Sequence, residues 1–152
     1  MEFLTGTTLR EMFRDSLPPL SRGLQILHQV SKGLAAMHAR GILHRDLSTN
    51  NIMLAERGEV KILDLGLSKD AGVAATRYSR DFLAGTVTYI APEIAHGETA
   101  SYASDIFSYG VVLYEAITGK NPFAAEHVMA MLYNTVNRAP EPITTFLPGC
   151  PG

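Results

Sequence analysis

Hydrophobic positions in this chain recur at two different periods, and each period predicts a different kind of element. Between residues 20 and 37, apolar side chains return every three or four positions, as they do along one face of a helix. The residues that form this stripe are Leu20, Leu24, Leu27, Val30, Leu34 and Met37. The spacing predicts a long amphipathic helix that ends at Gly41, which is expected at the C′ position.

A shorter helix is predicted upstream, over residues 7–15, with Thr7 or Thr8 as its N-cap. The segment SLPPL at 16–20 interrupts it, because two prolines cannot continue a helix. The chain should therefore begin with two separate helices.

Short extended runs follow the long helix, IMLA at 52–55 and EVKIL at 59–63. The ERG segment between them places Gly58 at the tip of a turn, so the pattern predicts a small β-hairpin. Residues 64–93 have little periodicity and many small or hydroxyl side chains. A loop of that length inside a compact domain is usually functional or disordered.

Residues 103–118 are apolar nearly all round, which predicts a buried helix at the centre of the fold. Gly119 is expected to cap this helix, and NPF at 121–123 separates it from a last helix at about 125–136. The Pro-rich tail from Arg138 onward is expected to be loop or linker. The predicted fold is therefore mainly α with a small β-hairpin.

Composition narrows the class of protein. The chain has 152 residues, enough for one domain with a real core, and 46% of them are hydrophobic. A formal charge of −2 and the absence of basic runs argue against nucleic acid as a partner. No stretch resembles a signal peptide or a membrane span. Cys150 is the only cysteine, which favours a reducing compartment; we expect a cytoplasmic location, or the cytoplasmic side of a membrane protein.

Polar side chains concentrate in HRDLSTNN, residues 44–51, just after the long helix. Asn51 precedes the first predicted strand and Asp64 follows the second, so their oxygens could converge on one ion. Mg²⁺ prefers oxygen ligands and often takes only one or two from the protein. Asp46 would then be available to accept a proton.

Each of these residues also has an ordinary explanation. A loop Asp is often a turn or cap residue, and Asn51 could close an Asx-turn. His44 alone is better explained as a packed structural histidine than as a base. The other histidines show no metal-ligand spacing. Only the joint spacing, together with the motifs that follow, favours a site.

Five segments, in this order, resemble the motif set of eukaryotic-type protein kinases. The matching segments are His44-Arg45-Asp46-Leu47 through Asn51 for H-R-D-L-x-x-x-N, Asp64-Leu65-Gly66 for D-F-G, Ala91-Pro92-Glu93 for A-P-E, DIFSYG at 105–110 for D-x-W-S-x-G, and the opening MEFLTGTTL for the hinge between the two kinase lobes. The resemblance covers essentially the whole chain. It implies a protein-kinase-like C-terminal lobe of the α+β family fold.

The resemblance implies a role for each polar residue of the cluster. Asp46 would accept or orient the proton of the substrate hydroxyl, while Asn51 and Asp64 would hold Mg²⁺ between the phosphates of ATP. These three residues are therefore the candidate catalytic set. Asp105 would hold the backbone of the 44–51 segment. Its ordinary explanation, a cap at the helix N-terminus with Ser104, is compatible with that role.

Adenine recognition is also implied by the resemblance. Glu2 and Leu4 would offer hinge backbone groups to the base, and Met53 would form the apolar floor under it. Methionine fills such gaps well, but Met53 would serve equally well as a plain core residue. The cofactors expected are thus ATP and Mg²⁺.

The segment from Asp64 to Glu93 corresponds in the resemblance to the activation segment. Arg45 could receive a phosphate from it, with Ser79 and Thr76 as acceptor candidates. Thr86 in GTVTYIAPE is typical of Ser/Thr-specific members, so protein substrates with Ser or Thr are expected.

Three residues depart from the family pattern. Ser48 stands where Ser/Thr kinases usually carry a lysine, and no Lys or Arg occurs in residues 47–50. One positive contact to the transferred phosphate is therefore missing. Leu65 replaces Phe and Phe107 replaces Trp, but both remain apolar and should still pack.

The sequence contains no glycine-rich loop and no V-A-I-K lysine, the parts that cover and orient the phosphates. We expect a partial kinase domain, with the hinge at 1–6, the C-terminal lobe at 7–152, no N-terminal lobe, and an end before the last helices. An arginine to pair with Glu93 is not found, since Arg138 comes too early. The expected function is Ser/Thr protein kinase, inactive as an isolated piece. The alternatives are a pseudokinase-type docking module without catalysis and, remotely, an unrelated helical domain.

Overall fold

Helices dominate the chain, and the computed structural model describes residues 5–63 and 87–148. The strands are β1 (Gly6–Thr8), β2 (Ile52–Ala55) and β3 (Val60–Ile62). The helices are α1 (Leu9–Asp15), α2 (Leu20–His38), α4 (Pro92–Ala95), α5 (Tyr102–Thr118) and α6 (Val128–Asn137). Single 3-10 turns are formed by η1 (Thr49–Asn51), η2 (Val87–Tyr89) and η3 (Ile143–Thr145).

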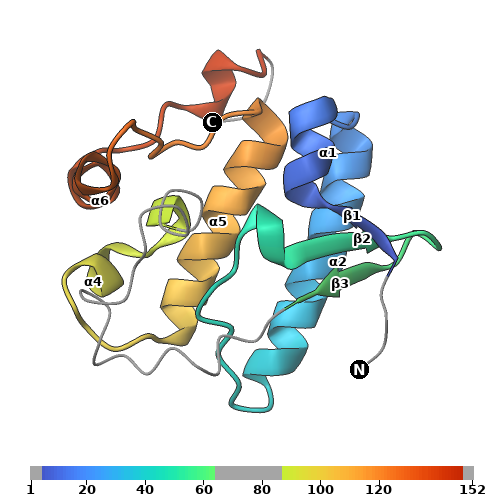
Figure 1. Ribbon diagram of the computed structural model, residues 1–152, viewed down its shortest axis with the longest axis horizontal. Helices are drawn as coiled ribbons and strands as arrows, with labels where there is room; N and C mark the ends of the chain where they lie inside the picture. Colours follow the sequence, from blue (N-terminus) through green and yellow to red (C-terminus); the bar gives the residue numbers. More distant parts are fainter. Residues whose placement is uncertain (1–4, 64–86, 149–152) are drawn as a thin grey trace.

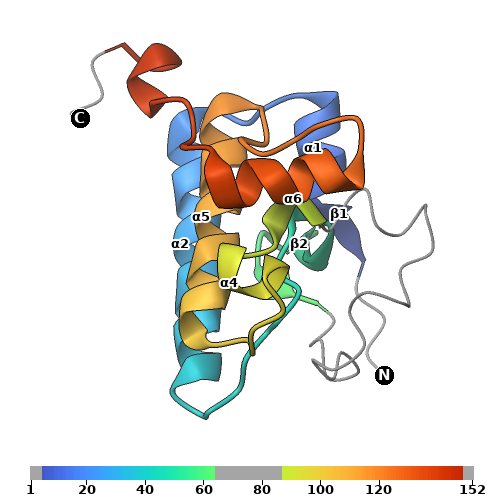
Figure 2. The ribbon, with the colours of Figure 1, turned by 90° about the vertical axis from the view of Figure 1, so that its left-hand side faces the viewer.

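The core lies between α2 and α5, which run side by side in both ribbon views (Figures 1 and 2). The buried apolar side chains at this contact are Ile26, Leu27, Val30 and Leu34 from α2, and Val111, Val112 and Ala116 from α5. Each fully buried aliphatic side chain contributes about 1.5–3 kcal/mol relative to an exposed one. The Tyr109 hydroxyl also donates to the Leu27 carbonyl at 3.1 Å. The predicted stripe is confirmed for Leu27, Val30 and Leu34. It is wrong for Leu20 and Leu24, which are 43% and 45% exposed, while Ile26, outside the predicted stripe, is buried.

The small sheet lies against α2 and has the strand order β1-β2-β3, antiparallel throughout (Figure 1). The predicted hairpin is confirmed, with Ile52 opposite Ile62 in the register of β2 and β3. The third strand, β1, was not predicted. It comes from residues expected to be hinge and helix cap, and it can pair closely because Gly6 has no side chain. A Cβ at Gly6 would lie 2.4 Å from the Leu54 carbonyl oxygen.

The helix ends follow local sequence signals. Thr8 is the N-cap of α1, and its hydroxyl accepts from the Glu11 backbone in a capping box, which settles the choice between Thr7 and Thr8. Beyond α2, Gly41 has φ 73°, and its N–H donates to the His38 carbonyl. Ile42 N–H reaches back to Met37, which completes a Schellman pattern around Gly41 as predicted. Gly119, also at φ 73°, ends α5.

The structure corrects several predicted boundaries and exposures. The last helix begins at Val128, three residues later than predicted, with His127 in extended conformation as its N-cap. The α5 helix is not buried all round, because Ile106 is 59% exposed. The end of the predicted 64–93 loop contains η2 and α4, and Pro92 starts α4 because its missing N–H would be unpaired there anyway. The tail carries the turn η3.

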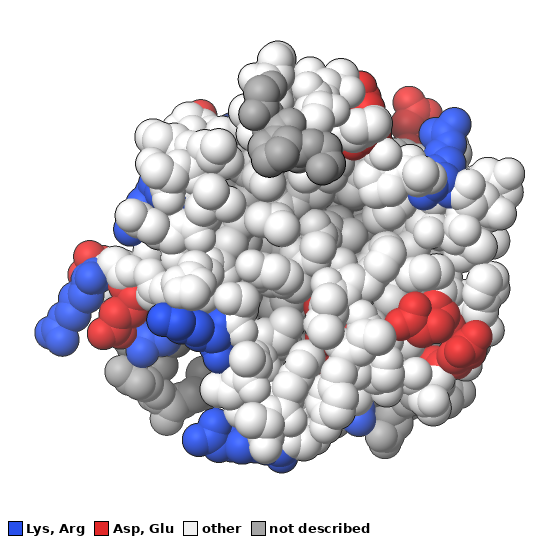
Figure 3. Space-filling view, turned by 180° about the vertical axis from the view of Figure 1, so that it is seen from behind, with Lys and Arg blue, Asp and Glu red and all other residues white. Residues whose placement is uncertain are grey.

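Charge is sparse over part of the surface. On the face opposite to Figure 1, most visible Lys, Arg, Asp and Glu side chains lie toward the margins, with uncharged residues between them (Figure 3). Within residues 5–63 and 87–148, every helix is too short or too polar to cross a lipid bilayer.

Candidate active site

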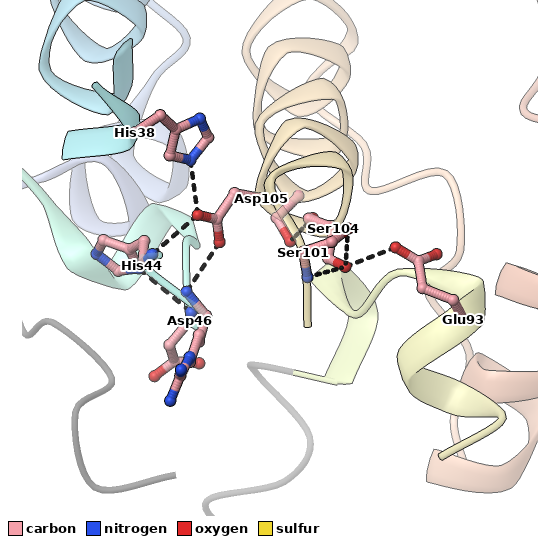
Figure 4. Close-up of polar contacts among 9 residues, drawn as sticks. His38, His44, Asp46, Glu93, Ser101, Ser104 and Asp105 are labelled. Atoms are coloured by element: carbon pink, nitrogen blue, oxygen red, sulfur yellow. Dashed lines mark hydrogen bonds and ion pairs between the residues drawn. The ribbon is translucent and has the colours of Figure 1, made fainter. Parts of the chain in front are cut away.

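The Asp105 carboxylate, at the start of α5, organises the segment that follows α2 (Figure 4). Its Oδ2 accepts from the His44 backbone N–H at 2.8 Å and from His38 Nε2 at 2.9 Å. Its Oδ1 accepts from the Arg45 backbone N–H at 2.8 Å. The side chain is only 2% exposed, so the carboxylate has lost its hydrating water, and these three donors take the place of that water.

Arg45 needs this support because its backbone is strained. Its φ of 66° lies in the left-handed region, and among the described residues it is the one non-glycine there. An L-residue in that region costs roughly 1–2 kcal/mol. The bonds from Asp105 to two successive backbone N–H groups hold the chain in this conformation.

The buried ring of His44 connects the end of β3 to Asp46. Nε2 donates to the Leu63 carbonyl at 2.9 Å, and Nδ1 accepts from the Asp46 backbone N–H at 3.2 Å. A carbonyl only accepts, so the proton of the neutral ring must sit on Nε2. The interpretation of His44 as a packed structural histidine is confirmed, because its ring is buried and both ring nitrogens are hydrogen-bonded to the backbone.

Asn51 and Asp46 are brought together. The Asn51 side-chain N–H₂ donates to the Asp46 carbonyl at 2.8 Å and to Asp46 Oδ2 at 3.2 Å. This orientation leaves Asn51 Oδ1 as the atom that can face a cation. The Asn51 carbonyl accepts from Leu63 N–H at 2.8 Å, so the residue that precedes Asp64 in sequence is tied to this pair.

Met53 lies on β2 next to this cluster. Ile52 and Leu54, its neighbours along the strand, pack into the core, so strand alternation places Met53 on the other face of the sheet. Thr8 and Lys61 are its register partners across the sheet. Met53 is thus not a member of the core cluster and remains suited to contact a ligand.

Several predicted site residues lie outside the described residues: Asp64, Glu2, Leu4, Leu65, Thr76, Ser79 and Thr86. The structure therefore describes Asp46 and Asn51 of the predicted catalytic set, and Met53 of the predicted adenine site. Over the described parts of the chain, no group of three or more His, Cys, Asp or Glu side chains could hold a metal ion.

The start of α5 also holds the A-P-E segment. Ser104 Oγ donates to Glu93 Oε1 at 2.6 Å, while the adjacent Asp105 points to the His44–Asp46 segment (Figure 4). Ser101, not Ser104 or Asp105, is the N-cap, with Ser104 as its capping-box partner. The expected cap at Ser104 and Asp105 is therefore corrected to Ser101. The expected role of Asp105 in holding the 44–51 segment is confirmed, because its carboxylate accepts from the backbone N–H of His44, 61 residues away in sequence.

The family departures at Ser48 and Phe107 have different consequences. Phe107 still packs, stacked on Phe123 with ring centroids 5.7 Å apart. Ser48 is 0% exposed, and its hydroxyl has no hydrogen-bond partner among the described residues. Ser48 is uncharged, and its buried hydroxyl is turned away from solvent, so this position offers no positive charge to a phosphate.

Sequence reasoning missed four polar residues of this region. His38 was set aside for lack of metal-ligand spacing, and Thr49, Tyr89 and Glu115 were not considered. Glu115 gave the clearest available signal, since a carboxylate in the apolar second half of a buried helix requires a partner. In the structure, the Tyr89 hydroxyl supplies it.

This arrangement can position one carboxylate and one amide oxygen on a rigid loop. The backbone of the loop is fixed from α5, its histidine is held in one tautomer, and Asn51 is oriented by Asp46 itself. Such a preorganised oxygen set is suited to handling a proton beside a hard cation.

Comparison with known proteins agrees with this geometry. The family model described as "Protein kinase domain" matches residues 1–145. "Probable serine/threonine-protein kinase PknB" of Bifidobacterium longum is 37% identical over 153 residues, 99% of this chain and 22% of that protein. "Serine/threonine-protein kinase PknA" of Mycobacterium tuberculosis is 38% identical over 149 residues, 97% of this chain and 34% of that protein. "Serine/threonine-protein kinase PknB" of Mycolicibacterium smegmatis is 36% identical over 146 residues, 93% of this chain and 23% of that protein.

The chain thus spans about a fifth to a third of the length of these relatives. The family match nevertheless extends over nearly all of its residues and contains the Asp46–Asn51 pair and Asp105. This chain belongs to the protein kinase domain family.

Proposed function

We propose that this chain is the C-terminal lobe of a serine/threonine protein kinase domain, with residues 1–6 as the hinge and 7–152 as the lobe. The reaction is transfer of the γ-phosphate of ATP to Ser or Thr hydroxyls of a protein substrate. The observation that carries the proposal is the Asn51–Asp46 pair, hydrogen-bonded at 2.8 and 3.2 Å within a loop that Asp105 fixes.

Asp46 is the residue that meets the substrate hydroxyl. A carboxylate oxygen of Asp46 accepts the hydroxyl proton as the substrate oxygen attacks the γ-phosphorus, and the bond from that phosphorus to the bridging oxygen breaks to release ADP. Phosphoryl transfer needs little covalent help from the protein, so positioning and electrostatic stabilisation are the main contributions. His44 and Asn51 both bond to Asp46, which restricts where its carboxylate can point.

Asn51 and Asp64 are the proposed Mg²⁺ ligands. The donor chemistry fits, because Asn51 spends its N–H₂ group on Asp46 and keeps its carbonyl oxygen for a cation. Asp64 follows Leu63, whose N–H and C=O bond to Asn51 and His44. Mg²⁺, when bound, would neutralise charge on the ATP phosphates.

Adenine would be bound by the hinge and the sheet. Glu2 and Leu4 are proposed to offer backbone groups, and the position of Met53 on the outer face of β2 supports its role as the apolar floor. Arg45 is exposed, which suits its proposed role as receiver of a phosphate from Ser79 or Thr76.

The proposal also covers the substrate class and the location. Thr86 and the printed names of the relatives support Ser/Thr specificity. The single cysteine supports a cytoplasmic location, or the cytoplasmic side of a membrane protein.

A second candidate function is favoured by one observation. The buried, unpartnered Ser48 hydroxyl takes the place of a lysine that would reach the phosphate. This supports a pseudokinase-type module that docks a protein without catalysis. The intact Asp46–Asn51 pair argues for catalysis, and we favour the kinase for that reason.

The test is phosphate transfer by the protein purified in the form that cells produce. With radiolabelled ATP, Mg²⁺ and a mixed protein substrate, we expect phosphoserine and phosphothreonine, lost in Asp46→Asn and retained in Asp15→Asn, an exposed-site control. ATP binding without transfer would favour the docking module. The 152-residue polypeptide alone should transfer little, because its sequence contains no glycine-rich loop or V-A-I-K lysine.

A further inference from the structure

We propose that Thr49 is a positioning residue, which locks the turn that carries Asn51 to the central helix α5 through Tyr89 and Glu115. This inference rests on the proposed function, since the turn is the one that would hold the Mg²⁺ ligand and the catalytic Asp46. Thr49, Tyr89 and Glu115 come from η1, η2 and α5, and all three are buried.

The protons in this chain of hydrogen bonds can be assigned by counting. Tyr89 has one hydroxyl proton, and its hydroxyl donates to Glu115 Oε2. The contact between Thr49 Oγ1 and the Tyr89 hydroxyl, at 2.8 Å, must then have Thr49 as its donor. The order of donation is Thr49 to Tyr89 to Glu115, and each hydroxyl proton has a defined acceptor.

Glu115 and Tyr89, two members of this series of hydrogen bonds, are each anchored by a further contact. Glu115 is buried in the second half of α5, and its Oε1 lies 3.9 Å from Arg10 Nη1 on α1. Tyr89 is also held through its carbonyl, which accepts from Ser108 Oγ at 2.7 Å. The phenol of Tyr89 is therefore held by α5 as an acceptor for Thr49.

Thr49 transmits this anchorage to the active-site loop. It is 0% exposed, and it begins η1, the turn that ends at Asn51. The Asn51 N–H donates to the Ser48 carbonyl at 3.0 Å across that turn. Asp105 holds the loop at residues 44 and 45, whereas Thr49 holds it at the other end. Asp46 therefore lies between two attachments to the same helix, and Asn51 lies two residues beyond the second, within the turn that Thr49 begins.

The experiment replaces the Thr49 hydroxyl with a methyl group of similar size. Thr49→Val should lower kcat about tenfold, the effect of losing roughly one buried hydrogen bond, with KM for ATP changed less than about twofold. Thr49→Ser keeps the hydroxyl and should restore most of kcat. Thr135→Val is the control, because the Thr135 hydroxyl is buried and donates within its own helix, to the Met131 carbonyl.

Amide hydrogen exchange provides a readout that does not require activity. Thr49→Val should speed exchange at the Asn51 and Leu63 amides about tenfold, with α6 amides unchanged. Tyr89→Phe should have a similar effect, and the double variant should be no worse than Tyr89→Phe alone. Unchanged exchange at Asn51 in Thr49→Val would overturn the inference, whether or not the protein transfers phosphate. A normal kcat in an active Thr49→Val protein would also overturn the inference. A wild-type protein that transfers no phosphate would contradict the proposed function alone.

Discussion

Asp105 Oδ1 accepts the Arg45 backbone N–H at 2.8 Å, across 60 residues of sequence. The bond joins the start of a rigid central helix to the one non-glycine residue with left-handed φ in the described chain. Strain at Arg45 is thereby balanced by a buried carboxylate, and the loop that presents Asp46 is fixed from outside itself. Strained residues of this kind persist only where the surrounding structure holds them.

Arg45→Gly tests whether the backbone there is strained. Glycine adopts left-handed φ without a steric penalty, so the free energy of unfolding should stay unchanged or rise by up to about 1 kcal/mol. Asn50→Gly, at an exposed position in η1, is the matched control and should lose about 0.5–1 kcal/mol. Urea unfolding of both variants measures the difference. Equal destabilisation by the two would show that Arg45 carries no strain.

Gly6→Ala tests the close approach of β1 to β2. The added Cβ would meet the Leu54 carbonyl oxygen at 2.4 Å, so we expect a loss of about 1–3 kcal/mol in the free energy of unfolding. Gly110→Ala in α5 is the control. Its Cβ would enter open space, and the helix should gain about 0.8–1 kcal/mol. A neutral Gly6→Ala would mean that β1 does not pair with β2.

Tyr89 should make the folded state sensitive to alkali. Burial, with the negative charge of Glu115 and the hydrogen bond to it, raises the pKa of Tyr89 above the ordinary tyrosine value. The folded protein therefore keeps this proton at pH values where the unfolded chain has lost it. Its contribution to stability is complete below about pH 10 and is lost as the pH rises toward the folded pKa.

Unfolding by urea between about pH 8 and 11 measures this dependence, and Tyr89→Phe should flatten it by up to about 1.4 kcal/mol per pH unit. Part of the slope should remain, because burial also raises the pKa of Tyr109 and of Tyr114. Tyr133→Phe, at an exposed site, should leave the slope unchanged. An identical slope in Tyr89→Phe would contradict the raised pKa.

Ser48→Ala should stabilise the protein. The Ser48 hydroxyl is buried without a partner among the described residues, and its removal should raise the free energy of unfolding by about 1 kcal/mol. Ser108→Ala is the control with the opposite sign, since its hydroxyl donates to the Tyr89 carbonyl at 2.7 Å. Thermal unfolding of the two variants shows whether each substitution raises or lowers the stability of the protein. A destabilised Ser48→Ala would show that the hydroxyl is hydrogen-bonded after all.

Local features of the fold were predictable from sequence. The three- and four-residue spacing from Leu20 to Met37 predicted α2, and Gly41 and Gly119 marked helix ends, because these signals act over a few residues. The strand β1 was missed because it depends on a partner distant in sequence and has no local signal of its own. Three residues that include a glycine carry no period, and only pairing with β2 makes them a strand.

The site was predictable only in part. The resemblance singled out Asp46, Asn51 and Asp105, and the structure brings Asp46 and Asn51 together beneath Asp105. Asp105 is bonded to His38, and the turn that carries Asn51 is bonded through Thr49 to Tyr89. These partners are far away in sequence and leave no periodic signal. Their roles depend on tertiary packing, which spacing alone does not encode.

Binding of Mg²⁺-ATP tests the central claim most directly. The melting temperature of the natural protein should rise with millimolar ATP when Mg²⁺ is present, because specific binding stabilises the folded state, and should not rise with ATP and EDTA. Asn51→Ala should abolish the shift, and the neighbouring exposed-site variant Asn50→Ala should retain it. A wild-type protein that shows no shift, or an Asn51→Ala variant that shifts as much as Asn50→Ala, would contradict a nucleotide–magnesium site at this loop.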